Sequence, residues 1–330
     1  MIRRLVLAFA VGALVAACAG ERAELVPAEL TTSTTVDAFT TTTATISTTT
    51  TAPPGPPDGE VAPNGRRYPG VATSGEEVAE RIVELERLLR ITDPSELAFA
   101  DLAHEQQMHY RHIGRNTDWL VPLWAASPPD LLWTIERHVT ARQQIGGIPG
   151  GDPPMNVPAW EIVEPLPADE LLALYRQASD ETGIDWTYLA AINLLETGYG
   201  RIRGTSTAGA QGPMQFLPTT WQEVSNGDIN DPYDAIPAAA RYLVRRGGPD
   251  DMQRALWGYN NTDYYVQAVS TYAELFRDDL ANYVATHQWE IHYSATIGDL
   301  WLPVGYFRTE SIPAEDYLAD APWSAPPPPA

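Results

Sequence analysis

Residues 186–200 read WTYLAAINLLETGYG, and the rest of the chain can be interpreted outward from this stretch. Asp185 stands directly before it and is a preferred residue for capping a helix N-terminus, so a helix is predicted at 186–197. Further helices are predicted at 167–179, 232–246 and 264–277 from the same kind of start and stop signals. The residues that supply these signals are Gly183, Asp231, Pro232, Gly247 and Asp263.

Glu196 is the residue of chemical interest in the first helix. It shares one face with Leu189, Ile192 and Asn193, so its carboxylate projects from a largely apolar stripe. Loss of hydration there favours the neutral form and raises the pKa toward the range of a general acid. Glu196 is therefore the candidate catalytic acid, although a Glu near a helix end is, taken alone, more often a solvated surface residue.

The remainder of the folded part is predicted to be a helical lobe and a hairpin. Apolar residues three to four apart predict helices at 76–90, 101–114 and 129–145, which form an N-terminal helical lobe at 73–160. Alternation of apolar and polar residues from Trp289 to Val304, with Gly298-Asp299 between two runs, predicts a β-hairpin. The fold class is therefore mainly α. The predicted divisions are a helical domain at 161–280, a C-terminal hairpin extension at 281–323 and a Pro-rich tail at 324–330.

The N-terminal sequence is typical of an exported protein. Residues 1–17 combine Arg3 and Arg4 with a 13-residue apolar run, which is typical of a signal peptide and too short to span a bilayer. The next residue is Cys18, the single Cys of the chain, in a context that resembles a bacterial lipoprotein box. Lipidation of Cys18 would anchor the chain to the outer face of the membrane; a simple cleaved signal is the alternative. Residues 18–72, with thirteen Thr between 31 and 51, are predicted to be a Thr/Pro-rich disordered linker.

Composition excludes several classes of function. A formal net charge of -22 argues against nucleic acid as a partner, because binding phosphates needs a basic face. His104, His109 and His112 could suggest zinc, but His109 follows His104-Glu105 at five residues and so misses the H-E-x-x-H spacing that places both imidazoles on one helix face. No metal site is therefore predicted, and no cofactor either. The segment Asn226–Asp231 lacks the terminal Glu of a calcium loop. No Ser nucleophile elbow is present for acyl transfer.

Several short strings follow one another in a fixed order. They are LETGYG at 195–200, GAQGPMQF at 209–216, PTTW at 218–221, DPYDAI at 231–236 and YN at 259–260. Together they resemble the soluble lytic transglycosylase family, with features of the membrane-bound B type, over about residues 166–279. Departures are Thr197 in place of the commoner Ser, Pro213 in place of Leu, and Gly258 where Ala is usual.

The resemblance implies a lysozyme-like fold with one catalytic carboxylic acid that cleaves the glycan strands of peptidoglycan. Glu196 would protonate the leaving oxygen, the acetamide of N-acetylmuramic acid would capture the anomeric carbon, and the ionised Glu196 would then deprotonate the 6-hydroxyl. The product would be a 1,6-anhydro-muramyl end. Ordinary glycosidases use two carboxylates instead.

The resemblance also implies roles for residues around the acid. Thr197 would orient Glu196, Met214 and Gln215 would line the cleft, Tyr259 would hydrogen-bond near the acid, and Asn260 would fix its loop. For Gln215 and Asn260, bonding to the backbone within their own loops is the alternative. Four aromatic residues offer faces that could stack on sugars or fill the core: Tyr199, Trp221, Tyr233 and Trp257. Tyr199 and Trp221 are the two taken as substrate-binding.

Two other functions remain open at this stage. One is a catalytically silent peptidoglycan-binding lipoprotein, and the other is a goose-type lysozyme, which would need Asp228, Asp231 or Asp263 to activate water in the cleft. All three functions place the protein outside the cytoplasm, in the cell wall. The sequence indicates no protein partner and no oligomeric state.

Overall fold

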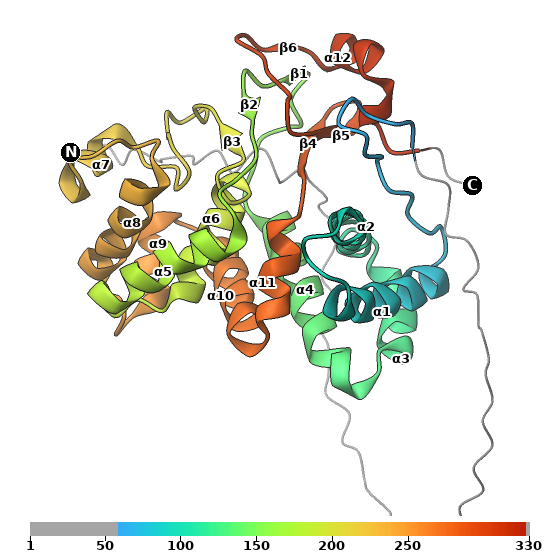
Figure 1. The fold of residues 1–330 in the computed structure, drawn as a ribbon, viewed down its shortest axis with the longest axis horizontal. Coiled ribbons are helices and arrows are strands. Elements are labelled where there is room, and N and C mark those ends of the chain that lie inside the picture. The colour runs from blue at the N-terminus through green and yellow to red at the C-terminus, as the bar shows by residue number, and fades with distance from the viewer. Residues whose placement is uncertain (1–58, 328–330) are drawn as a thin grey trace, which may run out of the picture.

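The computed structural model describes residues 59–327. The predicted signal peptide, Cys18 and the linker up to residue 58 lie outside the described residues, as do residues 328–330 of the tail. The described part is mainly helical, as the sequence predicts (Figure 1). It also contains three small two-stranded antiparallel sheets, of which the sequence predicts only the C-terminal hairpin.

Helix α6 (Trp186–Thr197) lies at the centre of the largest hydrophobic core. It packs against α10 (Asp263–Asp278), α5 (Ala168–Thr182) and α8 (Pro232–Arg246), and α10 also packs along α4 (Pro129–Gly147). Because neighbours enclose α6, nearly all of its side chains are buried, including polar ones. Asn193 satisfies one of its hydrogen bonds by donating to the Tyr175 hydroxyl at 2.7 Å.

The predicted boundaries around α6 are confirmed, with one correction. Asp185 and Asp231 each accept a hydrogen bond from a backbone N–H two residues on, as helix caps do. Gly183 ends α5 with a φ of 77°. The cap of α10, however, is Thr262, whose hydroxyl accepts from the Tyr264 N–H, while Asp263 is already the first helical residue. Between α6 and α10, two short helices were not predicted: α7 (Pro218–Val224) and α9 (Met252–Tyr259).

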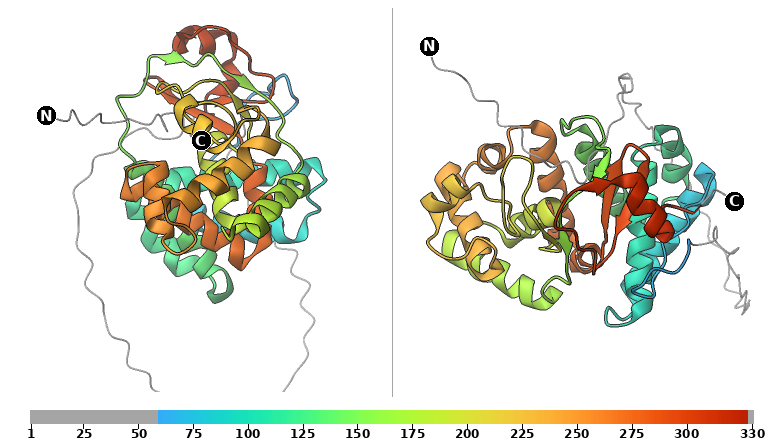
Figure 2. Two further views of the ribbon diagram at one scale, coloured as in Figure 1. Left: turned by 90° about the vertical axis from the view of Figure 1, so that its left-hand side faces the viewer. Right: turned by 90° about the horizontal axis from the view of Figure 1, so that it is seen from above.

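The N-terminal helices form a cluster that shares part of its core with the α6 region. The elements are α1 (Gly75–Ile91), α2 (Leu97–Ile113), the 3-10 turn η1 (Thr117–Trp119), α3 (Leu120–Ala126) and α4. Val78, Ile82 and Ile135 belong to a core of their own, whereas Phe99 and Ile145 belong to the core that contains α6. The N-terminal helices therefore pack on the helices around α6 through α4 (Figures 1 and 2).

The predicted linker ends earlier than residue 72. Gly59 to Tyr68 fold back on themselves through a hydrogen bond from the Gly59 N–H to the Tyr68 carbonyl and a bridge between Val61 and Arg67. Tyr68 is 1% exposed and packs with Trp301 of the C-terminal region. Residues 59–72 are thus part of the folded body, because an aromatic anchor gives this segment apolar surface to bury.

The C-terminal region contains the predicted hairpin and more. Strands β4 (Ile291–Ala295) and β5 (Gly298–Leu302) pair antiparallel, and residues 296–297, not Gly298-Asp299, form the turn. Ser324, expected in the frayed tail, is instead fully buried. The remaining elements are α11 (Leu280–His287), β6 (Ile312–Pro313), α12 (Ala314–Asp320) and η2 (Pro322–Ser324). β6 pairs with β1 (Asn156–Val157), and β2 (Glu161–Ile162) pairs with β3 (Ile202–Arg203).

Buried polar contacts attach the hairpin to α2. Arg111 of α2 binds both carboxylate oxygens of Asp299, and this positive charge holds the pKa of Asp299 well below its usual range despite burial. Gln107 of α2 exchanges two hydrogen bonds with the backbone of Glu290, at 2.8 and 2.9 Å. The Glu290 carboxylate accepts from the Trp301 indole at 3.1 Å.

Trp301 should be needed for the stability of this arrangement. It is fully buried between His104 and Trp323, so Trp301→Ala would leave a large cavity and an unpaired Glu290 carboxylate oxygen. We expect a loss of about 3–5 kcal/mol in the free energy of unfolding, measured by urea denaturation. Ile297→Ala, at a turn position that is 37% exposed, is the matched control and should change the value by less than about 0.5 kcal/mol. Equal effects of the two substitutions on the free energy of unfolding would contradict a stabilising role for the buried Trp301 side chain.

Candidate active site

Glu196 lies in the last turn of α6, at the end of the enclosed helix. Its carboxylate oxygen Oε1 accepts a hydrogen bond from the Tyr265 hydroxyl at 2.7 Å. Burial raises the pKa of Glu196 to about 7, and the hydrogen bond from Tyr265 opposes part of this rise because it favours the ionised form. The residue as a whole keeps partial access to solvent. Glu196 is therefore a carboxyl group that can hold and release a proton near neutral pH.

Two tyrosines stand beside this carboxyl group. The rings of Tyr259 and Tyr265 stack, with centroids 6.3 Å apart and planes 8° from parallel. The Tyr259 hydroxyl donates to the Met214 backbone carbonyl at 2.7 Å and not to Glu196. Burial and the nearby Glu196 charge raise the pKa of both phenols well above their usual value, so both stay protonated donors.

The direct partner of the acid is therefore Tyr265, which the sequence analysis did not single out. Tyr259, predicted to hydrogen-bond near the acid, lies one ring further away and supports the Met214 loop. Tyr265 sits in the first turn of α10 and belongs to no short string with a recognisable spacing. Only the helical period of α10, which places Tyr265 on the same face as Ala268 and Val269, could have indicated that it points inward.

Thr197 fastens the loop after α6 rather than contacting the acid. Its hydroxyl donates to the Pro213 carbonyl at 2.6 Å and accepts from the Gly200 N–H at 2.9 Å. These bonds hold the segment 209–216 against the C-terminal end of α6. Thr197 can therefore orient Glu196 only indirectly, by fixing the backbone on which the carboxyl group sits.

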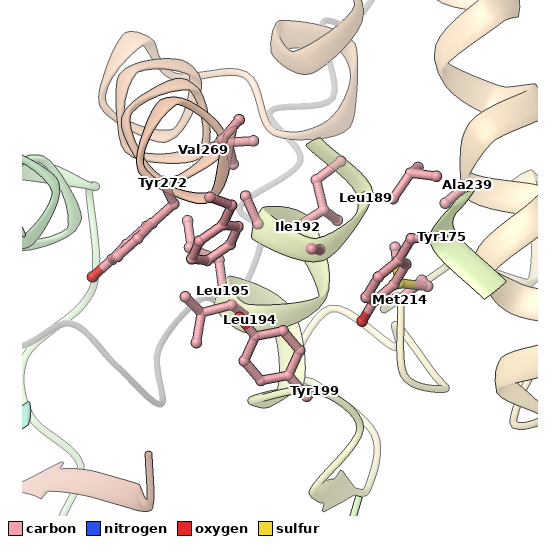
Figure 3. Close-up of a cluster of buried hydrophobic side chains, with 14 of the residues drawn as sticks. Tyr175, Leu189, Ile192, Leu194, Leu195, Tyr199, Met214, Ala239, Val269 and Tyr272 are labelled. Atoms are coloured by element: carbon pink, nitrogen blue, oxygen red, sulfur yellow. The ribbon is translucent and has the colours of Figure 1, made fainter. Parts of the chain in front are cut away.

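Three of the predicted substrate-binding side chains belong to the core. Met214 is fully buried near Tyr175, and Tyr199 is 2% exposed with its hydroxyl paired to Thr286 Oγ1 at 2.8 Å (Figure 3). Trp221 is 8% exposed and its indole N–H donates to the Gly227 carbonyl at 3.3 Å. The predicted stacking of Tyr199 and Trp221 on sugars is thus corrected, because neither ring has a free face in this packing.

The other two of the four aromatic residues are the exposed ones. Tyr233 is 49% exposed and Trp257 is 48% exposed. The Tyr233 hydroxyl donates to Glu170, which ties it to α5. Trp257 lies on α9, two residues before Tyr259. The sequence did not indicate which of the four aromatic side chains are exposed. In the structure two are buried and two are about half exposed.

Gln215 and Asn260 stabilise their own loops in this structure. The Gln215 side-chain amide donates to the Gly212 carbonyl at 3.0 Å, and its φ of 48° is unusual for a residue with a side chain. Asn260 follows the last residue of α9, and its carbonyl accepts from the Thr262 N–H at 2.8 Å. The Gln215 bond agrees with the alternative given from sequence, whereas the Asn260 bond joins two backbone groups and does not involve its side chain. Such a strained turn is also typical of functional sites.

Gly212 shows how closely this loop is packed. Its φ is 75°, and a Cβ there would lie 1.8 Å from the Ile229 carbonyl oxygen. A groove of about 480 Å³ runs along this side of the loop, and its lining includes Glu164, Asp228 and Asp231. Asp231 already caps α8 and Asp228 binds Asn230, so both carboxylates are used locally. Neither is hydrogen-bonded to Glu196.

Within residues 59–327, no group of three or more His, Cys, Asp or Glu side chains is arranged to hold a metal ion. His104 and His109, considered for zinc from the sequence, are buried in helix packing, and His104 hydrogen-bonds His292 at 2.8 Å between their Nε2 atoms.

Comparison with known proteins agrees with this geometry. Residues 173–278 match the family model of the transglycosylase SLT domain. The match runs from α5 to the end of α10 and so contains Glu196, Met214, Tyr259 and Tyr265. It supports a lytic transglycosylase, an enzyme that acts on peptidoglycan, with a lysozyme-like helical fold. No curated protein and no solved structure matches the chain.

Tyr265→Phe tests the hydrogen bond to the acid. Without the hydroxyl donor the ionised carboxylate loses a stabilising partner, so the pKa of Glu196 should rise above about 7. The measurement is the pH titration of the Glu196 carboxyl carbon by NMR, with the signal identified by its loss in Glu196→Gln. Tyr283→Phe removes a hydroxyl that donates to the Ala168 carbonyl instead and is the control. An unchanged or lowered pKa of Glu196 in Tyr265→Phe would contradict the hydrogen bond from Tyr265 to the ionised carboxylate.

Proposed function

We propose that this protein is a lytic transglycosylase that cleaves between N-acetylmuramic acid and N-acetylglucosamine and leaves 1,6-anhydro-muramyl ends. The observation that carries the proposal is the environment of Glu196, a carboxyl group with a pKa near 7 within a transglycosylase SLT domain. A general acid works best when its pKa lies close to the working pH, because it must be protonated before the reaction and must then release the proton readily.

One carboxyl group serves both halves of this reaction. Protonated Glu196 donates its proton to the leaving glycosidic oxygen while the substrate acetamide oxygen bonds to the anomeric carbon. The resulting carboxylate then accepts the proton of the 6-hydroxyl as that oxygen displaces the acetamide. Tyr265 supports the second stage, because its hydroxyl donates to the carboxylate. Proton and charge balance, and no water is consumed.

The two other functions have less support. A goose-type hydrolase needs a second carboxylate to activate water. Asp228 and Asp231 are both engaged in turn and cap bonds, and Asp263 lines a different pocket, together with Arg254 and Trp257. A catalytically silent binding protein would not need the Glu196 carboxyl group. Because this group is buried, its ionisation costs free energy. Both nevertheless define clear outcomes in the experiment below.

We further propose that the enzyme acts outside the cytoplasm and is tethered by a lipid on Cys18 through the Thr/Pro-rich linker. The support is the sequence of residues 1–58. Across residues 59–327 no helix is long and apolar enough to cross a membrane. The division into a helical lobe at 73–160, a lysozyme-like domain at 161–280 and an extension at 281–323 is likewise a proposal.

Glu196→Gln should abolish catalysis while leaving the fold intact. Glutamine keeps the shape of the side chain but cannot donate a proton, so release of anhydro-muropeptides from sacculi should fall at least about 1,000-fold. Mass spectrometry of the products is the measurement, and Glu181→Gln on the exposed surface of α5 is the control. Reducing-end products from the parent protein would indicate a lysozyme. No products, under conditions where a known transglycosylase works, would favour the binding protein.

The pH dependence follows from the raised pKa. Because the acid must be protonated to start the reaction, the rate should be highest below about pH 7 and fall about tenfold for each pH unit above it. The descending limb of kcat/KM against pH reports the free enzyme. In Tyr265→Phe the same limb should move to higher pH. A profile that is flat between pH 5 and pH 9 would be incompatible with Glu196 as the acid.

A further inference from the structure

A second pocket, of about 340 Å³, lies where the C-terminal end of α8 meets α9. Its lining includes three guanidinium groups and one indole, those of Arg245, Arg246, Arg254 and Trp257. No acidic residue lines it. The pocket is unusual for this chain, whose formal net charge is -22.

The positive charge of the pocket is largely uncompensated. Arg245 is held by Glu223, through the Glu223 carbonyl at 2.8 Å and its carboxylate at 3.3 Å. Arg246 and Arg254, by contrast, have no carboxylate oxygen within 4.0 Å among the described residues. Asp251 and Asp263 line an adjacent pocket together with Arg254. The carbonyl end of α8 adds a partial negative charge of about 0.5, which the two full charges outweigh.

Arg246 is held in place before any ligand arrives. Its guanidinium carbon lies 4.9 Å from the centre of the Tyr242 ring, and the Tyr242 hydroxyl donates to the Gly258 carbonyl at 2.6 Å. A Cβ on Gly258 would lie 3.1 Å from Arg246 Cγ and Cδ. A side chain at position 258 would therefore force Arg246 Cγ and Cδ to shift by a few tenths of an ångström.

We propose that the Arg246–Arg254–Trp257 pocket binds a saccharide that carries an oxyanion. A guanidinium group pairs with two oxygens of a carboxylate or phosphate, and an exposed indole offers a flat apolar face to a sugar ring. The anionic group is thus placed between Arg246 and Arg254, with the ring against Trp257. That the saccharide belongs to the cell wall rests on the proposed function; that the pocket binds it does not.

The pocket is connected to the acid by a row of rings. Tyr242 is in edge contact with Tyr259 at 5.5 Å, and Tyr259 stacks on Tyr265, which holds Glu196. Glu196 itself does not line this pocket, so a polymer bound here would be anchored apart from the acid. Carboxylate-bearing muramyl units and phosphate-bearing sugars of wall polymers share the required chemistry.

An NMR titration of the intact chain tests the proposal. The probe signal is the indole N–H of Trp257, identified by its loss in Trp257→Phe. The titrants are N-acetylmuramic acid, N-acetylglucosamine 6-phosphate and neutral N-acetylglucosamine. At least one anionic sugar should bind about tenfold or more tightly than the neutral one, and whichever binds better identifies the carboxylate or the phosphate source.

Variants then assign the contacts. Arg246→Gln and Arg254→Gln should each lower the affinity for the anionic sugar by up to about fivefold, as expected for exposed charge pairs. The double variant should lower this affinity further. Gly258→Ala should also lower the affinity for the anionic sugar, because the added methyl group displaces Arg246. The matched controls are Arg87→Gln on α1 and Trp124→Phe on α3, both exposed and outside the pocket, which should leave the affinity unchanged.

Three outcomes would overturn the proposal: equal affinity for neutral and anionic sugars, no saturable shift of the Trp257 signal with either anionic sugar, or full retention of binding in the double Arg variant. The titration is repeated in Glu196→Gln, where binding at the pocket should persist. Failure of the pocket is thereby distinguishable from failure of the proposed catalysis, which is read from reaction products alone.

Discussion

The chemistry proposed for this protein depends on the removal of water from one carboxyl group. Glu196 lies in the last turn of a helix against which α5, α8, α10 and α11 pack, and its carboxylate accepts a hydrogen bond from the hydroxyl of Tyr265. In such a setting the neutral acid is favoured until near pH 7. An exposed Glu at the same helix end would be ionised at neutral pH and would have no proton to give.

Enclosure of α6 requires segments that are remote in sequence. The left-handed Gly198 follows the helix, and Ile291 of β4 lies so close that a Cβ on Gly198 would come within 2.7 Å of Ile291 Cδ1. The chain after Gly198 continues into β3, which pairs with β2, and Glu161 of β2 bridges Phe307 in turn. The turn after Glu196 is thus held by residues from both before and after the segment 173–278 that matches the family model.

Buried polar groups determine how the N-terminal helices meet the hairpin. The Arg111–Asp299 pair, the Gln107–Glu290 exchange and the His104–His292 contact all cross from α2 to the C-terminal region. Taking such groups out of water costs about as much as their pairing returns, so they contribute little net stability. They do select one alignment, because any other alignment would leave a charge or an amide buried without a partner.

Sequence alone was enough to predict the helical class, most helix boundaries and the hairpin, because caps and apolar periodicity act over a few residues. Short strings were enough to single out Glu196 as a candidate. It failed where contacts between distant segments decide the outcome. Tyr265, which belongs to none of the short strings, donates to Glu196, and Tyr199 and Trp221 are buried while Tyr233 and Trp257 are exposed. Which face of an aromatic side chain meets solvent depends on how α9, α10 and the 209–216 loop pack together, and that packing is a property of the assembled tertiary structure rather than of any local pattern.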